Sequence, residues 1–496
     1  MRQRIALGFV CATWLGLALP AAAQEAKPKA AAPAGKVAER EEVRSASRLL
    51  EAWIETQMAY RGLPGLTLAV VHDQELVWVK GFGLADLDKK TPASASTIYR
   101  IASISKLFTA VAVLQLRDQG KLKLDDPVEK YLPWFKVKTS HADAQPITVR
   151  QLLMHTSGLP REAAFPYWTD FKFPSRKEMI DALPAQEAVY PPDTQWKYSN
   201  LGLALAGEVV VAVSGQAFED YVQKHIFDPL GMKSSSVSLP EAHKARLATG
   251  YGRRLPDGQR EVRPFTDAQG IAPAAGLATT AEDLARFISL QFRDGSAGGS
   301  QILKGSTLRE MHRVHWLLPD WKSGRGLGFH IIHRDDGDLV GHGGWVAGYQ
   351  SSVYFRPKDK VAVIALYNAD DGLPYPGATD SVVDRTFQWV GAAITKSAPA
   401  PESPKARPEW QQYVGKYRSP WADNQVLVMN GKLVLINPTE HDPTGTLATL
   451  VPTAEHQFRI EGGSVSGPHG ELVTFEMKDG KVARLKIGVN YANPLK

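Results

Sequence analysis

Strand patterns stand at both ends of a long, mostly helical interval in this chain of 496 residues. Residues 65–86 read as two strands around a turn at residues 72–74, which is typical of a β-hairpin. Residues 326–370 also alternate between apolar and polar side chains, whereas the segment from about 125 to 300 predicts helices and long loops. This arrangement predicts an α+β domain with helices segregated around an antiparallel sheet.

Composition shifts mark a second domain near the C-terminus. Residues 395–409 hold four prolines and show no apolar periodicity, as expected of a linker. Beyond them, residues 410–496 contain short strand candidates separated by turns, which predicts a small all-β barrel or sandwich. We therefore place the first domain at residues 45–394.

The first residues have the features of a secretory leader. Residues 1–4 are positively charged, residues 5–19 are apolar, and residues 21–23 are alanines that offer a cleavage site. Because the apolar run is short for a membrane span, we expect residues 1–23 to be removed, with an uncleaved anchor as the alternative. Residues 24–44 then form a flexible tether, and we expect a secreted or periplasmic protein without a membrane span.

The mature chain would contain no cysteine, because Cys11 is the only one and lies in the leader. Such a chain has no disulfide, no thiol nucleophile and no thiolate metal ligand. The net charge of +6 falls to +4 without Arg2 and Arg4, and basic residues do not cluster with aromatic ones, so nucleic acid is not an expected partner.

The thirteen histidines are scattered singly, and no His-Glu-x-x-His or Walker sequence occurs, so we expect neither a metal nor another cofactor. His155 follows an apolar helix in "ITVRQLLMHTSGLP", which we expect to stop at Ser157 and Gly158. We interpret this histidine as structural.

The segment "YRIASISKLFTAVAVLQLRDQG" brings a hydroxyl and an amine together. Ser103 and Lys106 are three residues apart, and on a helix such positions share one face, with β-carbons about 5–6 Å apart. A serine is a weak nucleophile until a base removes its proton, and a lysine is such a base only if its surroundings lower its pKa. The following residues are apolar on nearly every side, which predicts a buried helix. The alternative interpretation is a capped helix with a solvated lysine.

Two further triplets add polar groups. "WKYSN" places Tyr198 and Asn200 directly before an apolar helix, where a phenol could relay a proton and an amide could hold a substrate carbonyl. "GHGGWVAGYQSSVYF" places His342, Gly343 and Gly344 on a predicted strand, and glycines let a substrate backbone lie against a strand. Each triplet taken alone also fits a structural role: a helix cap in the first case, a hairpin with a surface histidine in the second.

Together, the three motifs resemble those of the serine β-lactamase and penicillin-binding protein superfamily. Ser-x-x-Lys, Tyr-x-Asn and His-x-Gly follow one another at separations of 95 and 144 residues. The Tyr-x-Asn form is similar to the class C β-lactamase branch, with its esterases, D-aminopeptidases and D-alanyl carboxypeptidases. The resemblance covers roughly residues 45–395 and implies a β-lactamase-like antiparallel sheet flanked by helices, with an all-helical subdomain. The C-terminal region resembles the small β-barrel domains attached to some of these hydrolases.

The resemblance also implies roles for individual residues. Ser103 is expected to accept the acyl group, and Lys106 and Tyr198 to share the acid–base work, with the order of their proton transfers left open. Asn200 is expected to bind the amide or ester side chain of the substrate. The backbone N–H groups of Ser103 and Trp345 are expected to form an oxyanion hole.

The third motif departs from the Lys-Thr-Gly of β-lactamases. The resemblance implies that the substrate lies along His342, Gly343 and Gly344. A histidine is mostly neutral at pH 7 and a glycine has no hydroxyl, so this motif is expected to bind a carboxylate more weakly than Lys-Thr-Gly does. A rival triplet, Lys-Ser-Gly at residues 322–324, is closer to Lys-Thr-Gly. Because that stretch is polar and glycine-rich, we interpret it as a loop and favour His342.

We therefore expect an exported serine hydrolase that acts through an acyl-enzyme on Ser103. Its substrate would be a small molecule or peptide: an ester, a D-amino-acid peptide or a β-lactam, in that order of preference. The alternative is a penicillin-binding or sensor-type module that acylates without efficient turnover, or that only binds wall peptides. The sequence does not determine an oligomeric state.

Overall fold

The computed structural model describes residues 36–295, 299–372, 375–377, 381–396, 407–420, 422–429, 431–437, 446–463 and 468–495. The predicted leader, much of the predicted tether and the centre of the predicted linker lie outside these residues. Within the segment predicted as a tether, a 3₁₀ turn η1 (Val37–Glu39) is followed by helix α1 (Glu41–Arg61). The chain divides into two compact units between Ala393 and Ile394, and each is described separately.

The larger unit is built around a nine-stranded antiparallel sheet in the order β3-β2-β1-β11-β10-β9-β8-β7-β6. Its strands are β1 (Gly65–His72), β2 (Glu75–Asp86), β3 (Thr91–Pro92), β6 (Trp316–Leu317), β7 (Ser323–Arg325), β8 (His330–Ile332), β9 (Leu339–Val346), β10 (Tyr349–Arg356) and β11 (Val361–Tyr367). Strands from opposite ends of the unit meet at its centre, where Leu66 of β1 lies opposite Tyr367 of β11. The predicted α+β architecture is confirmed.

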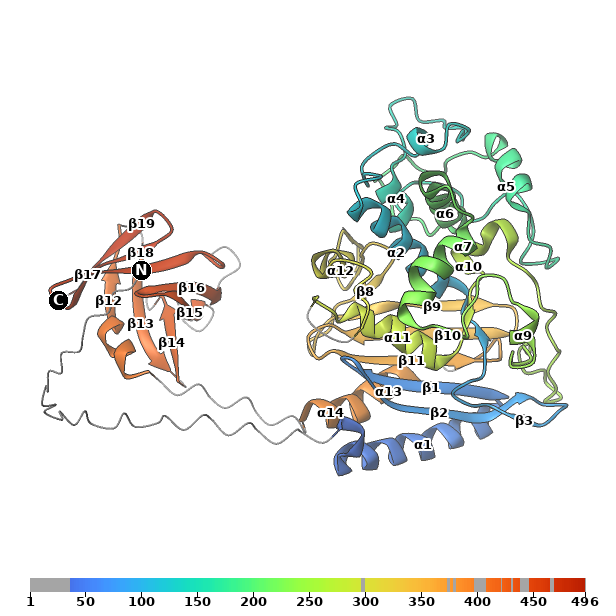
Figure 1. The fold of residues 1–496 in the computed structure, drawn as a ribbon, viewed down its shortest axis with the longest axis horizontal. Helices are drawn as coiled ribbons and strands as arrows, with labels where there is room; N and C mark the ends of the chain where they lie inside the picture. The colour runs from blue at the N-terminus through green and yellow to red at the C-terminus, as the bar shows by residue number, and fades with distance from the viewer. Residues whose placement is uncertain are drawn as a thin grey trace, which may run out of the picture. The chain divides into compact units, whose positions relative to one another are not determined.

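Helices cover the central strands, and β1 is buried along nearly its whole length. Helix α11 (Ala281–Gln291) packs against β1, β2 and β11. Helix α1 packs against α13 (Val382–Thr386) and the π-helical turn η6 (Phe387–Gly391), with the rings of Trp53 and Trp389 edge to face at 6.1 Å. Figure 1 shows α1 on the side of the sheet away from the helical part of the unit.

The helical part is centred on three segments that pack together: α2 (Ser105–Asp118), α6 (Asn200–Ser214) and α10 (Ala272–Ala275). The other helices described there are α3 (Val128–Tyr131), α4 (Val149–Met154), α5 (Arg176–Ala182), α7 (Phe218–Val222), α8 (Asp228–Leu230), α9 (Glu241–Lys244) and α12 (Gly305–Met311). Helix α14 (Ala392–Lys396) spans the division between the two units. Helix α2 is buried from Ser105 to Leu116, because apolar side chains occupy nearly all of its faces.

Within the part of the chain that the structure describes, no single helix is long and apolar enough to cross a membrane. The bent pair Asn200–Ser214 and Phe218–Leu230 passes that test only when the two helices are taken together.

Two local predictions are wrong. Residues 323–325, interpreted as a loop, form strand β7 because they pair with β6 on one side and with β8 on the other. Helix α4 ends at Met154, before the predicted Ser157 and Gly158, because His155 takes a left-handed conformation with φ of 62°. Such a residue ends a helix, and glycine usually fills this position.

The smaller unit is a closed eight-stranded barrel in which successive strands pair and β19 returns to β12. After the 3₁₀ segment η7 (Pro408–Tyr413), its strands are β12 (Gly415–Arg418), β13 (Asp423–Met429), β14 (Lys432–Ile436), β15 (Ala448–Ala454), β16 (Gln457–Gly462), β17 (Leu472–Lys478), β18 (Lys481–Ile487) and β19 (Asn490–Pro494). Aromatic side chains fill its core, with Tyr413 stacked on Phe475 at 4.4 Å between ring centroids. Of the two predicted architectures, barrel or sandwich, the barrel is observed.

Candidate active site

Ser103 lies at the entrance to the buried helix, in the 3₁₀ turn η2 (Ala102–Ile104) directly before α2. Ala102 has a positive φ of 46°, a conformation that residues other than glycine rarely adopt. Strained residues of this kind persist only where the surrounding structure holds them, and they cluster at functional sites. The first residue of α2 is also held in place, because the Ser105 hydroxyl accepts a hydrogen bond from the N–H of Leu277 at 3.0 Å.

Lys106 projects its amine to the hydroxyl of Ser103. Its side chain is fully buried, and Nζ lies 3.0 Å from Ser103 Oγ. The same nitrogen lies 2.8 Å from Asn200 Oδ1 and 2.8 Å from the carbonyl oxygen of Ala274. The three segments that pack at the centre of the helical part therefore meet at this one nitrogen.

The surroundings of Lys106 disfavour its charged form. Burial lowers the pKa of the amine well below its ordinary value, and the charge of Arg161 adds to this lowering. The carboxylate of Glu162 acts in the opposite direction. Burial is the largest of these influences, so the structure meets the condition that a lysine must satisfy to serve as a base.

Tyr198 reaches the same serine from the other side. Its hydroxyl donates a hydrogen bond to Ser103 Oγ at 2.8 Å, and burial raises the pKa of this phenol. His155 holds the segment in place, because its Nδ1 accepts the backbone N–H of Ser199 at 3.0 Å and its ring packs on that of Tyr198 at 4.4 Å. These contacts agree with the structural interpretation of His155.

Asn200 is fixed by a carboxylate that the sequence analysis did not single out. Its Nδ2 donates to both carboxylate oxygens of Glu162 at 2.9 Å, which leaves Oδ1 to accept from Lys106. Glu162 also accepts a hydrogen bond from the hydroxyl of Tyr167 and forms an ion pair with Arg161 at 3.0 Å. No local pattern marks Glu162, because its partner Asn200 lies 38 residues further along the chain.

The third motif lies on β9, directly beside the turn η2 that carries Ser103. A Cβ on Gly344 would stand 2.3 Å from the carbonyl oxygen of Ile101, so only glycine permits this close approach. The neighbouring strand β10 adds a hydrogen bond from Ser351 Oγ to the same carbonyl at 2.9 Å. The sheet thereby fixes the position of the turn that carries Ser103.

The strand register accounts for the predicted oxyanion donor on Trp345. Val346 and Tyr349 flank a two-residue turn, so they pair through their own backbone groups. Because backbone directions alternate along a strand, the N–H of Trp345 points away from β10. On that side, among the described strands, β8 pairs with β9 only as far as Gly341, opposite His330. The N–H of Trp345 therefore lies at an edge that no described strand covers.

His342 presents no positive charge at this edge. Burial is the main cause that lowers its pKa well below the ordinary value, and a positive charge on the nearby His330 or Lys106 would act in the same direction. Its Nδ1 lies 2.5 Å from the carbonyl oxygen of Gly343, so in the neutral ring this nitrogen carries the proton and donates it. The Nε2 atom is then an acceptor.

The rival triplet lies elsewhere. Lys322 is exposed before β7, and the hydroxyl of Ser323 donates to Asp320 at 2.6 Å. Strand β8 separates β7 from β9. The structure therefore places His342, and not Lys322, on the strand beside the turn that carries Ser103.

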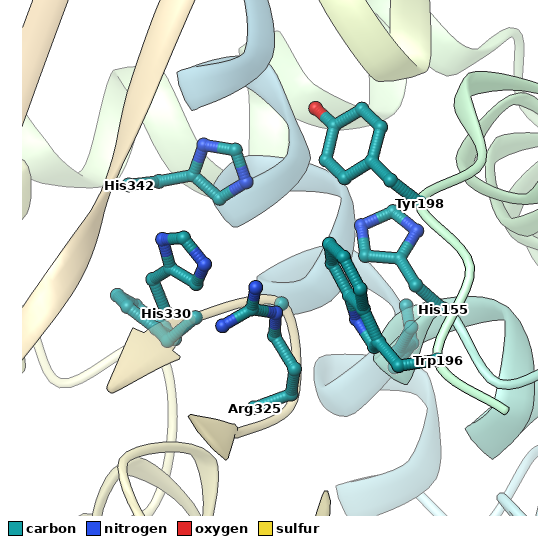
Figure 2. Close-up of a pocket in the computed structure, with 9 residues that line it drawn as sticks. His155, Trp196, Tyr198, Arg325, His330 and His342 are labelled. Carbon is teal, nitrogen blue, oxygen red and sulfur yellow. The ribbon is translucent and has the colours of Figure 1, made fainter. Parts of the chain in front are cut away.

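A cavity of about 60 Å³ opens beside Tyr198 and His342 (Figure 2). Its walls include His155, Trp196, Tyr198, Arg325, His330 and His342. The sequence analysis did not single out Trp196, Arg325 or His330, which come from a loop and from strands β7 and β8. Among the described residues, no group of three or more His, Cys, Asp or Glu side chains is arranged to hold a metal ion.

Comparison with known sequences gives one family. The family described as Beta-lactamase matches residues 50–385. Protein flp of Staphylococcus aureus (strain MW2) is 27% identical over 324 residues, which make up 64% of this chain and 62% of that protein. Beta-lactamase-like protein 2 of Dictyostelium discoideum is 30% identical over 307 residues, or 60% of this chain and 55% of that protein. The match thus spans 62% and 55% of the length of these two relatives, less than two thirds in each case.

Solved structures agree with the fold. The octameric penicillin-binding protein homologue from Pyrococcus abyssi superposes with a TM-score of 0.61 at 26% identity, covering 90% of this chain and 99% of that one. A β-lactamase/D-alanine carboxypeptidase from Pseudomonas syringae gives a TM-score of 0.57 at 19% identity, covering 72% of this chain and all of that one; this second likeness concerns the fold alone. From the match over residues 50–385, the chain belongs to the beta-lactamase family.

Proposed function

We propose that the chain is a serine hydrolase that forms an acyl-enzyme on Ser103 and cleaves an ester or an amide. Members of the family are generally serine hydrolases, and their nucleophile and its lysine lie in a Ser-x-x-Lys motif. The observation that carries the proposal is the double contact on Ser103 Oγ, with the amine of Lys106 at 3.0 Å and the phenol of Tyr198 at 2.8 Å. Both distances are within reach of proton transfer.

The hydrogen bonds of Lys106 indicate which group takes the first proton. A neutral amine has two N–H donors and one lone pair. The carbonyl oxygens of Asn200 and Ala274 account for both donors, which leaves the lone pair for the hydroxyl proton of Ser103. Since burial raises the pKa of Tyr198, the phenol keeps its proton at rest, and Lys106 is the base of the first step.

The reaction then proceeds in two halves. Ser103 Oγ bonds to the substrate's carbonyl carbon as its proton moves to Lys106, and the carbonyl oxygen becomes an oxyanion. The N–H groups of Ser103 and Trp345 stabilise this oxyanion, a contribution of about 10²–10³ in kcat for each such donor. The proton that Lys106 took passes through Tyr198 to the leaving oxygen or nitrogen as its bond to the carbonyl carbon breaks. Water then attacks the carbonyl carbon of the acyl-enzyme and gives one proton to Lys106. The bond between that carbon and Ser103 Oγ breaks, the acid leaves, and Lys106 returns the proton to Oγ.

The third motif sets the expected order of substrates. A neutral His342 and a Gly343 without a hydroxyl offer a weak grip on the carboxylate of a β-lactam. We therefore expect esters first, D-amino-acid peptides second and β-lactams last. From the N-terminal leader we further propose that the protein acts outside the cytoplasm on a small-molecule or peptide substrate.

A second candidate function is a sensor-type module that acylates and then deacylates slowly. The observation in its favour is the engagement of Glu162, whose carboxylate is occupied by Asn200, Tyr167 and Arg161. A carboxylate held in this way is not available to activate a deacylating water.

Labelling and turnover together test these two functions. The wild type, Ser103→Ala and Lys106→Ala are incubated with a fluorophosphonate probe and with p-nitrophenyl acetate, with the exposed Ser96→Ala and Lys121→Ala as matched controls. Steady turnover that is lost only in the two site variants supports the hydrolase. Stoichiometric labelling without turnover supports the sensor. If the wild type is not labelled, the covalent chemistry of Ser103 is refuted.

A further inference from the structure

Arg325 is a buried cation without an anionic partner. Its side chain is only 6% exposed, and its guanidinium makes a single hydrogen bond to a described residue, from Nη1 to the carbonyl oxygen of Gly324 at 2.8 Å. No carboxylate of the described residues lies within ion-pair distance of it. Buried charges in proteins are ordinarily paired. The guanidinium of Arg325 could therefore bind an anion from outside the chain.

The guanidinium is held in a fixed orientation and keeps its charge. It lies over the ring of Trp196, with Cζ 4.1 Å from the ring centroid. Burial lowers the pKa of Arg325 to about 10, so the group is still protonated at neutral pH. Figure 2 shows the guanidinium directed into the space between His330 and Trp196, below His342.

The side chains of His330 and Trp196 add hydrogen-bond donors around this space. The rings of His330 and His342 stack at 5.9 Å, and burial together with the charge of Arg325 lowers the pKa of His330 to about 3. A neutral imidazole still offers one N–H donor. The indole nitrogen of Trp196 is buried without a hydrogen-bond partner among the described residues. Arg325, His330 and Trp196 thus bring donors to this space, whereas the one N–H of neutral His342 is already donated to Gly343. None of the cavity's side chains is acidic.

The size of the cavity limits what could supply the missing charge. Its volume of about 60 Å³ compares with about 10–15 Å³ for a single buried water, so it has room for a halide ion or a carboxylate group. We propose that this cavity is a binding site for a singly charged anion of that size, with Arg325 as its charged ligand.

Two sources could provide this anion. One is a free halide from solution; the other is a carboxylate of the substrate, and this second source rests on the proposed hydrolase function. Tyr198 and His342 line both the cavity and the site around Ser103. An anion bound to Arg325 would therefore lie against the phenol that contacts the nucleophile.

Quenching of the fluorescence of Trp196 by a halide tests anion binding directly, and it does not require the protein to hydrolyse a substrate. The full-length protein is titrated with iodide at constant ionic strength, with a bulky sulfonate as the balancing anion, and tryptophan fluorescence is followed. We expect a saturable component of quenching that disappears in Arg325→Gln and in Trp196→Phe. Quenching that rises linearly with iodide and is the same in all three proteins would overturn the proposal.

A direct measurement covers the case in which Arg325→Gln fails to fold. Crystals of the wild type are soaked in bromide, and anomalous scattering locates the bound ions. A bromide peak within hydrogen-bond distance of the Arg325 guanidinium supports the site, whereas crystals with bromide elsewhere and none at Arg325 refute it. Arg325→Lys, which keeps the charge, should retain saturable quenching.

Kinetics then distinguish the two sources. Two esters with the same leaving group, one carrying a carboxylate on its acyl chain and one neutral, are compared in the wild type and Arg325→Gln. A rise in KM of at least tenfold for the anionic ester alone identifies the substrate's carboxylate. Equal halide dependence for both esters, lost in the variant, identifies a free anion. Saturable quenching in a protein that hydrolyses neither ester would refute the hydrolase and leave the anion site standing.

Discussion

Replacement of Lys106 by methionine should change how the stability of the larger unit depends on pH. Burial lowers the pKa of the amine well below its ordinary value, whereas in the unfolded chain the pKa returns to about 10.4. Between these two values the unfolded state binds one proton more than the folded state. The free energy of unfolding of the wild type therefore rises with pH in this window, by about 1.4 kcal/mol per pH unit.

The sign follows from which state holds the proton. Above the ordinary pKa the amine is neutral in both states, and below the lowered pKa it is charged in both, so the contribution of Lys106 is flat outside the window. Methionine has a similar length and does not titrate. Its cost is independent of pH: Asn200 Oδ1 and the carbonyl of Ala274 lose a donor, at about 1–3 kcal/mol each.

The measurement is the difference in unfolding free energy between the wild type and Lys106→Met across the pH range from neutral to alkaline. Calorimetry is suitable because it can follow the larger unit and the barrel as separate transitions, and only the first should respond. Lys121→Met, at an exposed lysine just after α2, is the matched control and should give a flat difference. A flat difference for Lys106→Met would mean that the amine is charged in the folded protein, and its role as a base would then be refuted.

Three further outcomes are expected. Glu162→Gln removes a carboxylate that raises the pKa of Lys106, so the acidic limb of the profile of kcat/KM against pH should move to lower pH; an unmoved limb contradicts the coupling. Gly344→Ala places a Cβ 2.3 Å from the carbonyl oxygen of Ile101, so it should lower the free energy of unfolding by about 1–3 kcal/mol. It should also remove most of the ester turnover; denaturation measures the first effect and p-nitrophenyl acetate hydrolysis the second. Phe475→Ala should cost about 3–5 kcal/mol in the calorimetric transition of the barrel, and loss of fluorophosphonate labelling of Ser103 in that variant would show that the two units are not independent.

The sequence predicted those parts of the site that sit in short local motifs. Ser103, Lys106, Tyr198 and Asn200 were each marked by a pattern of a few residues next to an apolar helix, and the structure brings all four within hydrogen-bond distance of a common network. The sheet was predicted in the same way, because alternation along a strand survives in the sequence wherever one face is buried. The catalytic roles of these residues remain predictions.

Residues whose importance depends on a distant partner were missed. Glu162 and Arg325 belong to none of the three motifs, and neither spacing nor periodicity distinguishes them from solvated side chains. Their roles arise from the fold, which brings Glu162 to Asn200 and buries Arg325 against Trp196. Strand β7 was misread for a related reason: its three residues include a glycine, and pairing with both neighbours outweighs the weak local preference.

The pairing of β1 with β11 bears on when the proposed reactivity can appear. These strands are joined by most of the larger unit, and a long loop must close before contacts so distant in sequence can form. In an unfolded chain Lys106 is in water, where its amine is an ordinary ammonium. On the proposed mechanism such a chain has no base beside Ser103, so covalent labelling of Ser103 would report that the larger unit has folded.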